Sequence, residues 1–323
     1  MSHLTREQRY TICTMLQSGY PQCEIARVIN KDKSVVSREI RRNADARSGQ
    51  YKDDLAHRKY LKRQAYKVKQ RTFTPEVEAY VRDKLRLKYS PEQIAGVAKT
   101  NGDNCVSHER IYQFIWQDKR KKGTLYLDLR NRGRRYKKRS VIYDKRGTIP
   151  NRTDISLRPP EVEQRERFGD LEIDLIIGKN HKNAILTIND RATGLAKLCK
   201  LTGKDAEQLA VATIDCLKDW KPYLHTITSD NGKEFSSHQM IATELNIDFF
   251  FAKPFASWQR GSNENYNRLV RQYIPKKVDF DYVTHDYVKY VEQQLNNRPR
   301  KRFGYLSPNQ IVSRVWNTLV KSG

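Results

Sequence analysis

Two aspartates in the second half of the chain interrupt sequence that is otherwise apolar. Asp174 lies inside residues 171–177, which read L-E-I-D-L-I-I and are typical of a buried strand. A carboxylate in such a strand is costly to bury unless a cation or a hydrogen-bond donor meets it. Asp230 directly follows residues 224–229, a second predicted strand, and open α/β sheets place their sites at strand ends. Both aspartates are therefore candidates for a functional site.

A third acid, Glu264, begins a predicted helix over residues 263–273. Arg268 and Arg271 follow it four and seven positions later, so the three side chains share one stripe of the helix. Such a stripe suits a surface that binds a metal ion and phosphate. Taken alone, Glu264 is better explained by the preference of acids for helix N-termini.

The residues around these acids alternate between strand and helix patterns. The predicted strands span residues 171–177, 183–189, 194–201, 224–229 and 247–251, and the predicted helices span 205–220, 236–245 and 263–273. Three meandering strands followed by alternating helices and strands form a mixed five-stranded sheet. The sequence therefore predicts an α/β domain.

Most of the positive charge lies in the other half of the chain. Lys plus Arg is 62 and Asp plus Glu is 37, a net charge of +25, and residues 1–150 hold 36 of the basic and 16 of the acidic residues. The densest basic run is 130–139. It serves equally well as a solvated linker and as a segment that follows phosphates. A basic half joined to a nearly balanced half indicates a polyanion-binding module joined to a second domain.

Composition excludes two other classes of protein. No apolar run approaches the roughly 18 residues that a membrane-spanning helix needs, so no membrane association is expected. The chain has five cysteines, an odd number, and no two of them form a C-x-x-C pair. This favours reduced thiols in a cytoplasmic protein.

Residues 4–43 contain the start and stop signals of three short helices. Ser34 is a plausible N-cap for the third helix, over residues 35–42, with Val36 and Ile40 toward a core. The side chains left on its outer face are Ser37, Arg38, Arg41 and Arg42. This is the layout of a helix-turn-helix whose last helix enters the major groove of DNA, where Ser34 would also make contact. An ordinary three-helix bundle with a charged surface is the alternative.

A second unit repeats the pattern. Residues 74–87 read as a helix, Ser90 starts another, and Ser107 starts a third. His108 and Arg110 are among the exposed positions of that third helix, and we expect them to contact DNA. The predicted organisation is a helix-turn-helix domain over residues 1–50, a basic helical linker over 51–73, a second such domain over 74–125, a basic linker over 126–160 and the α/β domain over 161–323.

The order and spacing of the three acids resemble a known catalytic core. Asp230 and Glu264 are separated by 33 residues, as in the D-D-E core of transposases and retroviral-type integrases. The resemblance extends over nearly all of residues 4–310, and is to the insertion-sequence thirty family of bacterial transposases. Its motifs include L-T-R-E-Q-R-Y, S-V-V-S-R-E-I-R-R-N, S-P-E-Q-I-A-G, E-I-D-L-I-I-G, T-S-D-N-G-K-E-F, Q-R-G-S-N-E-N-Y-N-R-L-V-R-Q-Y-I-P-K and L-N-N-R-P-R-K-R-F-G-Y-L-S-P.

This resemblance implies a ribonuclease-H-like fold and a catalytic, metal-binding triad of Asp174, Asp230 and Glu264. The chain departs from the family pattern in having Asp170 and Glu172 on the same strand face as Asp174, so Glu172 could support the metal or compete for it. Two further accessory candidates are Asn231 and Asn263, which could orient phosphates or water. The expected phosphate contacts near the triad are Arg260, Arg268 and Arg271.

The implied chemistry is a metal-dependent transesterification. Three adjacent carboxylates repel one another unless a cation is present, and Mg²⁺ prefers oxygen ligands. Two Mg²⁺ ions, or Mn²⁺ in their place, would clamp both oxygens of an in-line displacement. Water would first cut the strand at the element end, and the freed 3′-OH would then attack target DNA. The expected partners are double-stranded DNA, as terminal inverted repeats and target, and a second copy of the chain in a homodimer or higher assembly near the nucleoid.

Two other functions remain open at this level. One is a repressor with two helix-turn-helix units and a catalytically inert α/β domain, which leaves the three well-placed acids unexplained. The other is a related nuclease without strand transfer, which the sequence separates poorly from a transposase.

Overall fold

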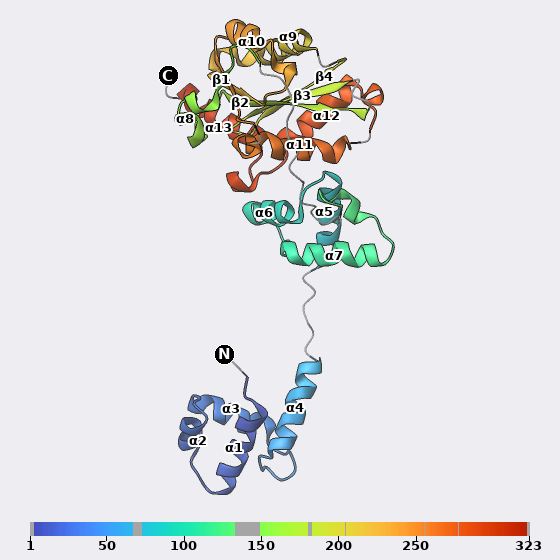
Figure 1. Ribbon diagram of the computed structural model, residues 1–323. Helices are drawn as coiled ribbons and strands as arrows, with labels where there is room; N and C mark the ends of the chain where they lie inside the picture. The colour runs from blue at the N-terminus through green and yellow to red at the C-terminus, as the bar shows by residue number, and fades with distance from the viewer. Residues whose placement is uncertain are drawn as a thin grey trace. The chain divides into compact units, whose positions relative to one another are not determined.

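The computed structural model describes residues 3–66, 73–132, 149–179, 183–203, 205–254, 256–276 and 278–321. The chain forms two compact units, Met1–Arg71 and Thr72–Gly323 (Figure 1). The basic run from residue 133 onward lies outside the described residues, as do parts of both predicted basic linkers. No described helix is long and apolar enough to cross a membrane. The five cysteines are free thiols.

The first unit is a small helical domain. Its helices are α1 (Arg6–Gln17), α2 (Gln22–Val28), α3 (Lys33–Asn43) and α4 (Asp53–Tyr66). Ile12, Ile25 and Val36 are fully buried between them, and the burial of Val36 is as expected from its place on the third helix. The N-cap predicted at Ser34 is wrong. Asp32 caps α3 by accepting a hydrogen bond from the Ser34 backbone N–H at 2.7 Å, because the helix already begins at Lys33 and Ser34 lies inside its first turn.

The second unit begins with three further helices. They are α5 (Pro75–Arg86), α6 (Pro91–Asn101) and α7 (His108–Arg120). Thr74, Ser90 and Ser107 cap them, each accepting from a backbone N–H three residues later. Their apolar faces close a separate core that includes Ile94 and Ile111. The three start signals read from the sequence are confirmed.

A single mixed sheet organises the rest of the unit. Its strands are β1 (Thr153–Asp154), β2 (Asp170–Ile177), β3 (Ala184–Asp190), β4 (Ala196–Leu201), β5 (Thr226–Ser229) and β6 (Asp248–Phe251), in the order β1-β6-β5-β2-β3-β4. β3 is antiparallel to both β2 and β4, whereas β5 lies parallel to β2 and β6 parallel to β5. Three meandering strands followed by two parallel ones form a ribonuclease-H-like arrangement.

The expected five strands become six. The additional strand, β1, pairs in parallel with β6 through only two residues, Thr153 and Asp154. A strand of two residues is too short to show the alternation by which strands are recognised in a sequence. It also carries the sheet into the segment that we read as a linker.

Helices cover both faces of the sheet (Figure 1). Leu171, Ile173 and Leu175 of β2 pack with α9 (Ala206–Leu217) and α10 (His238–Leu245). On the other face Ile176 packs with α11 (Gly261–Tyr273) and α12 (His285–Asn296). The remaining helices are α8 (Glu161–Gln164) and α13 (Pro308–Lys321). Because strand side chains alternate, the β2 face that carries Glu172 and Asp174 is the one that meets α11.

Gln93 is one of several side chains that attach the helical part to the sheet part. Gln93 Oε1 accepts from the Ser90 backbone N–H at 2.8 Å and from Arg298 Nε at 3.1 Å. Its Nε2 donates to the Pro299 carbonyl at 2.6 Å. The residue that completes the capping box of α6 therefore also holds the loop that follows α12.

Candidate active site

The sheet register brings the two aspartates together. β2 and β5 run parallel, with Glu172 opposite Thr228, and the same offset places Asp174 beside Asp230 just past the end of β5. Neighbouring strands lie about 4.8 Å apart. Two carboxylates from adjacent strands therefore meet at one edge of the buried sheet.

Arg260 supplies the positive charge between them. It ends the short 3-10 turn before α11, and its guanidinium lies 3.7 Å from Asp174 Oδ2 and 3.3 Å from Asp230 Oδ2. Its NH1 also donates to the Ile173 carbonyl at 3.2 Å. The guanidinium is thus a cation held where the two acids need one.

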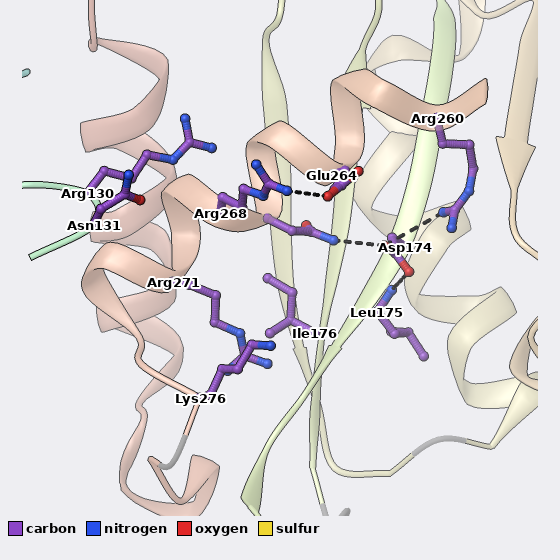
Figure 2. A pocket seen from close by; sticks show the side chains of 11 residues that line it. Arg130, Asn131, Asp174, Leu175, Ile176, Arg260, Glu264, Arg268, Arg271 and Lys276 are labelled. Atoms are coloured by element: carbon purple, nitrogen blue, oxygen red, sulfur yellow. Dashed lines mark hydrogen bonds and ion pairs between the residues drawn. The ribbon is translucent and has the colours of Figure 1, made fainter. Parts of the chain in front are cut away.

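Asp174 is fixed by hydrogen bonds at both oxygens (Figure 2). Oδ1 accepts from the Leu175 backbone N–H at 2.9 Å, and Oδ2 accepts from Asn267 Nδ2 at 2.8 Å. Burial raises the pKa of Asp174 to about 6, while Arg260 lowers it and Asp230 raises it. A partly buried acid next to a second acid favours a bound cation.

Glu264 lies on the wall of the same cleft but does not join the two aspartates. The cleft, of about 540 Å³, is lined by Asp174 from β2 and by Glu264 from α11. Glu264 is half-exposed and pairs with Arg268, one turn later, at 2.6 Å (Figure 2). The structure therefore brings Asp174 and Asp230 together and leaves Glu264 on the wall of the cleft, paired with Arg268.

Glu172 makes different contacts from those expected of an accessory metal ligand. Its Oε1 lies 2.5 Å from Arg191 NH1, and its Oε2 accepts from the Asn263 backbone N–H at 2.8 Å. The side chain is fully buried. Asn263 lies in the first turn of α11, which has no side-chain cap of its own. Glu172 thus holds the start of the helix that carries Glu264.

The other accessory candidates serve the local structure. Asn231 accepts from Arg152 NH1 at 2.6 Å and donates to the Ala252 carbonyl at 2.5 Å, which secures the loop after β5. Asn263 Oδ1 accepts from Thr187 at 3.3 Å. Asp170, on the same strand face as Asp174, is paired with Arg167 at 2.9 Å.

The predicted DNA-contacting side chains of the first unit all lie on its surface. On α3 these exposed residues are Ser34, Ser37, Arg38, Arg41 and Arg42. On α7 of the second unit, His108 is exposed, whereas the Arg110 guanidinium stacks over the Phe73 ring with 4.8 Å to its centroid. Arg38, Arg41 and Arg42 therefore lie together on the exposed face of α3, as the sequence pattern predicts.

The sequence analysis did not place Asn267 or Arg130 at the cleft, which both residues line. Asn267 follows Glu264 by three residues, so the helical stripe could have revealed it. Arg130 arrives from the segment after α7 and donates to Asn265 Oδ1 at 2.8 Å. Arg130 belongs to the basic run 130–139, but no local pattern places it at this cleft, because 135 residues separate the two partners. Arg271 lines the cleft as expected and donates to the Ile177 carbonyl at 2.9 Å.

The donor set fits a divalent cation. Asp174 and Asp230 offer carboxylate oxygens, the ligands that Mg²⁺ prefers, and the guanidinium of Arg260 occupies the position of positive charge between them. Within the described ranges no three acids, histidines or cysteines lie close enough to hold one ion.

The sheet order, the paired acids and the basic helical domains define an enzyme of the ribonuclease-H-like class that works on DNA. A helix-turn-helix domain family matches residues 1–43. The transposase for insertion sequence element IS4351 of Bacteroides fragilis is 52% identical over 98% of this chain and 97% of its own length. The transposase InsI for insertion sequence element IS30A of Escherichia coli is 30% identical over 97% of this chain and 84% of its own.

The chain belongs to the insertion-sequence thirty (IS30) family of transposases, as the motifs indicated. Among solved structures, the catalytic core domain of BIV integrase aligns with 47% of this chain and 98% of its own, with a TM-score of 0.38 and 18% identity.

Proposed function

We propose that this transposase cuts DNA at the ends of its insertion sequence and joins the freed 3′-OH to target DNA at a site formed by Asp174, Asp230 and Glu264. The observation that carries the proposal is the pair of aspartates, from adjacent parallel strands, that share one cationic group. Divalent cations, two Mg²⁺ or Mn²⁺ in their place, would supply the Lewis acidity for in-line displacement at phosphorus.

The chain's own residues would position the DNA for this displacement. Hydrogen bonds from Leu175 and Asn267 hold the Asp174 carboxylate in place before any ligand arrives. Arg268 and Arg271 line the same cleft, where guanidinium groups can orient phosphate oxygens. Arg260 would exchange its carboxylate partners for phosphate when a metal binds.

The helical domains would select the DNA. We propose that the outer face of α3 reads the terminal inverted repeats in the major groove, and that α7, with His108 and Arg110, adds contacts to the same site. Two element ends must meet for joining, so the active form would be a homodimer or a higher assembly. It would act in the bacterial cytoplasm, in association with the nucleoid.

The test incubates purified protein with labelled duplexes that carry both element ends. Mg²⁺ should support nicking at the ends and then joined products, and EDTA should abolish both. Asp230→Asn should lose at least a hundredfold in rate at unchanged affinity for the duplex, since it removes a charged ligand. Asp248→Asn, at an exposed acid that begins β6, is the matched control.

Two results would replace the proposal. Tight binding of paired ends with no cleavage under any divalent metal would assign a repressor. Nicking without joined products would assign a nuclease.

A further inference from the structure

A second cavity lies on the opposite side of α11 from the catalytic cleft. Glu264 and Arg268 face the cleft, whereas Ser262 and Tyr266 of the same helix line this second cavity, which has a volume of about 500 Å³. Arg130 lines both. One helix and one arginine therefore connect the two spaces.

The second cavity is lined by positive charge without matching negative charge. Its cationic residues are Arg130, Arg165, Arg300, Lys301 and Arg302, and its lining includes no acid. Lys301 pairs with Glu92. Across the described part of the chain, none of the four arginines has a carboxylate within ion-pair distance. Such a cluster repels itself and would be stabilised by an anion.

The electrostatic strain is evident at Arg300. The pKa of Arg300 is lowered to about 10, chiefly by burial and also by Arg302 and Arg130, against the opposing effect of Tyr266. Two acids, Asp190 and Glu172, raise the pKa of Arg302 from a distance, but both already accept other hydrogen bonds. The protein thus keeps several guanidinium groups close together without neutralising them itself.

Neutral donors in the same cavity also lack partners. The Tyr266 side chain is buried, with 2% of its surface exposed, and neither its hydroxyl nor that of Ser262 has a hydrogen-bond partner among the described residues. A buried hydroxyl without a hydrogen-bond partner destabilises the fold. Gly261 and Ser262 open the 13-residue helix α11, and a helix N-terminus favours anions. A Cβ at Gly261 would meet nothing within 4 Å.

We propose that this cavity binds a backbone phosphate of the DNA substrate, with Arg300, Arg302 and the Tyr266 hydroxyl as its donors. The inference rests on the proposed function, which places DNA at α11. Arg130 would then lie between two bound phosphates, one in this cavity and one in the catalytic cleft. The catalytic helix would be held against DNA from both sides.

Two substitutions in the full chain test the site. Tyr266→Phe removes only the unpartnered hydroxyl, so the free protein should melt no lower than the wild type. Arg302→Gln removes one exposed cation at the cavity. Lys221→Gln, at an exposed lysine of the 3-10 turn after α9 that lines neither cavity, is the matched control.

The first measurement is the affinity for a duplex that carries the element end, as a function of salt. Tyr266→Phe should raise Kd about 3- to 10-fold without changing the salt slope, because the lost group is neutral. Arg302→Gln should lower the slope of log K against log salt by about 1, as expected for one phosphate contact. The proposal would be overturned if both variants bound the duplex with the same Kd and the same salt slope as the Lys221→Gln control.

The second measurement replaces DNA with inorganic phosphate at constant ionic strength. Phosphate should raise the Tm of the wild type, and both variants should lose most of this increase. Protection by phosphate without any change in duplex binding would show a site for free anions and overturn the DNA assignment. If the wild type bound no duplex, the proposed function would fail as well. Phosphate protection that both variants lose would then identify an anion site without DNA.

Discussion

The partly buried Asp174 and the fully buried Asp190 are held by quite different groups. Asp174 faces an arginine and a second acid, whereas Asp190, at the end of β3, accepts from the Gly169 backbone N–H at 2.9 Å and from Thr193. Burial raises the pKa of Asp190 to about 6 despite these donors. The two carboxylates have similar pKa values, yet only Asp174 has a cation beside it and a cleft in front of it.

The raised pKa of Asp190 predicts how stability depends on pH. Its folded-state pKa exceeds the unfolded value, so its contribution is complete below about pH 4 and is lost as the pH rises through about 6. The full effect is about 3 kcal/mol. Urea unfolding of wild type and Asp190→Asn at several pH values should show the wild type gaining relative stability toward acid. A difference that does not vary with pH would contradict the assignment.

Arg260 predicts a competition at the aspartate pair. Since its guanidinium occupies the position of positive charge, a divalent cation must displace it. Arg260→Gln should therefore lower the Tm without metal and increase the rise in Tm that Mg²⁺ produces. Calorimetry at matched ionic strength measures both, with Arg271→Gln as the comparison in the same cleft. An unchanged Mg²⁺ response would exclude the competition.

At the scale of elements, α11 depends on a residue from another element for its first turn. Glu172 of β2 accepts from the Asn263 backbone N–H and is itself paired with Arg191. Arg191 in turn lies 2.9 Å from Glu163. A chain of charges, buried at Glu172 and Arg191 and exposed at Glu163, therefore ties the sheet to the helix next to the proposed catalytic acids.

Glu172→Gln should weaken this tie in a measurable way. The variant leaves Arg191 with less compensation, and we expect it to unfold about 2–4 kcal/mol more easily. End cleavage should fall about tenfold while the affinity for the duplex stays the same, because α11 is displaced rather than removed. Glu161→Gln, at an exposed acid, is the control. A matching loss of DNA affinity would point to general misfolding instead.

The sequence predicts a residue's place where the signal lies in neighbouring residues. It does not predict contacts between residues that are far apart in the chain. Asp174 and Asp230 stand out because each adjoins an apolar run, and Ser90 because its cap and Pro91 are adjacent in sequence. Arg260 could be named as a phosphate contact, but its position between the two aspartates follows from the sheet register and the turn before α11. The roles of Glu172 and Arg130 depend on partners 91 and 135 residues away.

At the scale of the second unit, helices α5–α7 pack directly against the domain that contains the sheet. Gly96 of α6 lies under the ring of Tyr305, where an added Cβ would come within 2.3 Å of the ring. Tyr89 and Gln93 also hydrogen-bond to the loop after α12. Stability of the two parts should therefore be shared.

The Gly96→Ala substitution tests whether the contact between the two parts stabilises the second unit. Helix propensity alone would stabilise the variant by about 1 kcal/mol, but the clash with Tyr305 should reverse the effect and lower the Tm of the second unit by several degrees. Gly261→Ala, where a Cβ meets nothing, should leave the Tm unchanged or raise it. Stabilisation by Gly96→Ala would refute the packing argument.

The double use of Gln93 also constrains how such proteins can be recombined. Its side chain both starts α6 and grips Arg298 and Pro299, so α5–α7 cannot be exchanged for the corresponding helices of a relative unless both sides of that contact travel together. The first unit has its own core and is free of this requirement. Chimeras that exchange the first unit should therefore be joined between residues 66 and 73, whereas grafts that separate Gln93 from Arg298 should lose these hydrogen bonds and melt at a lower temperature.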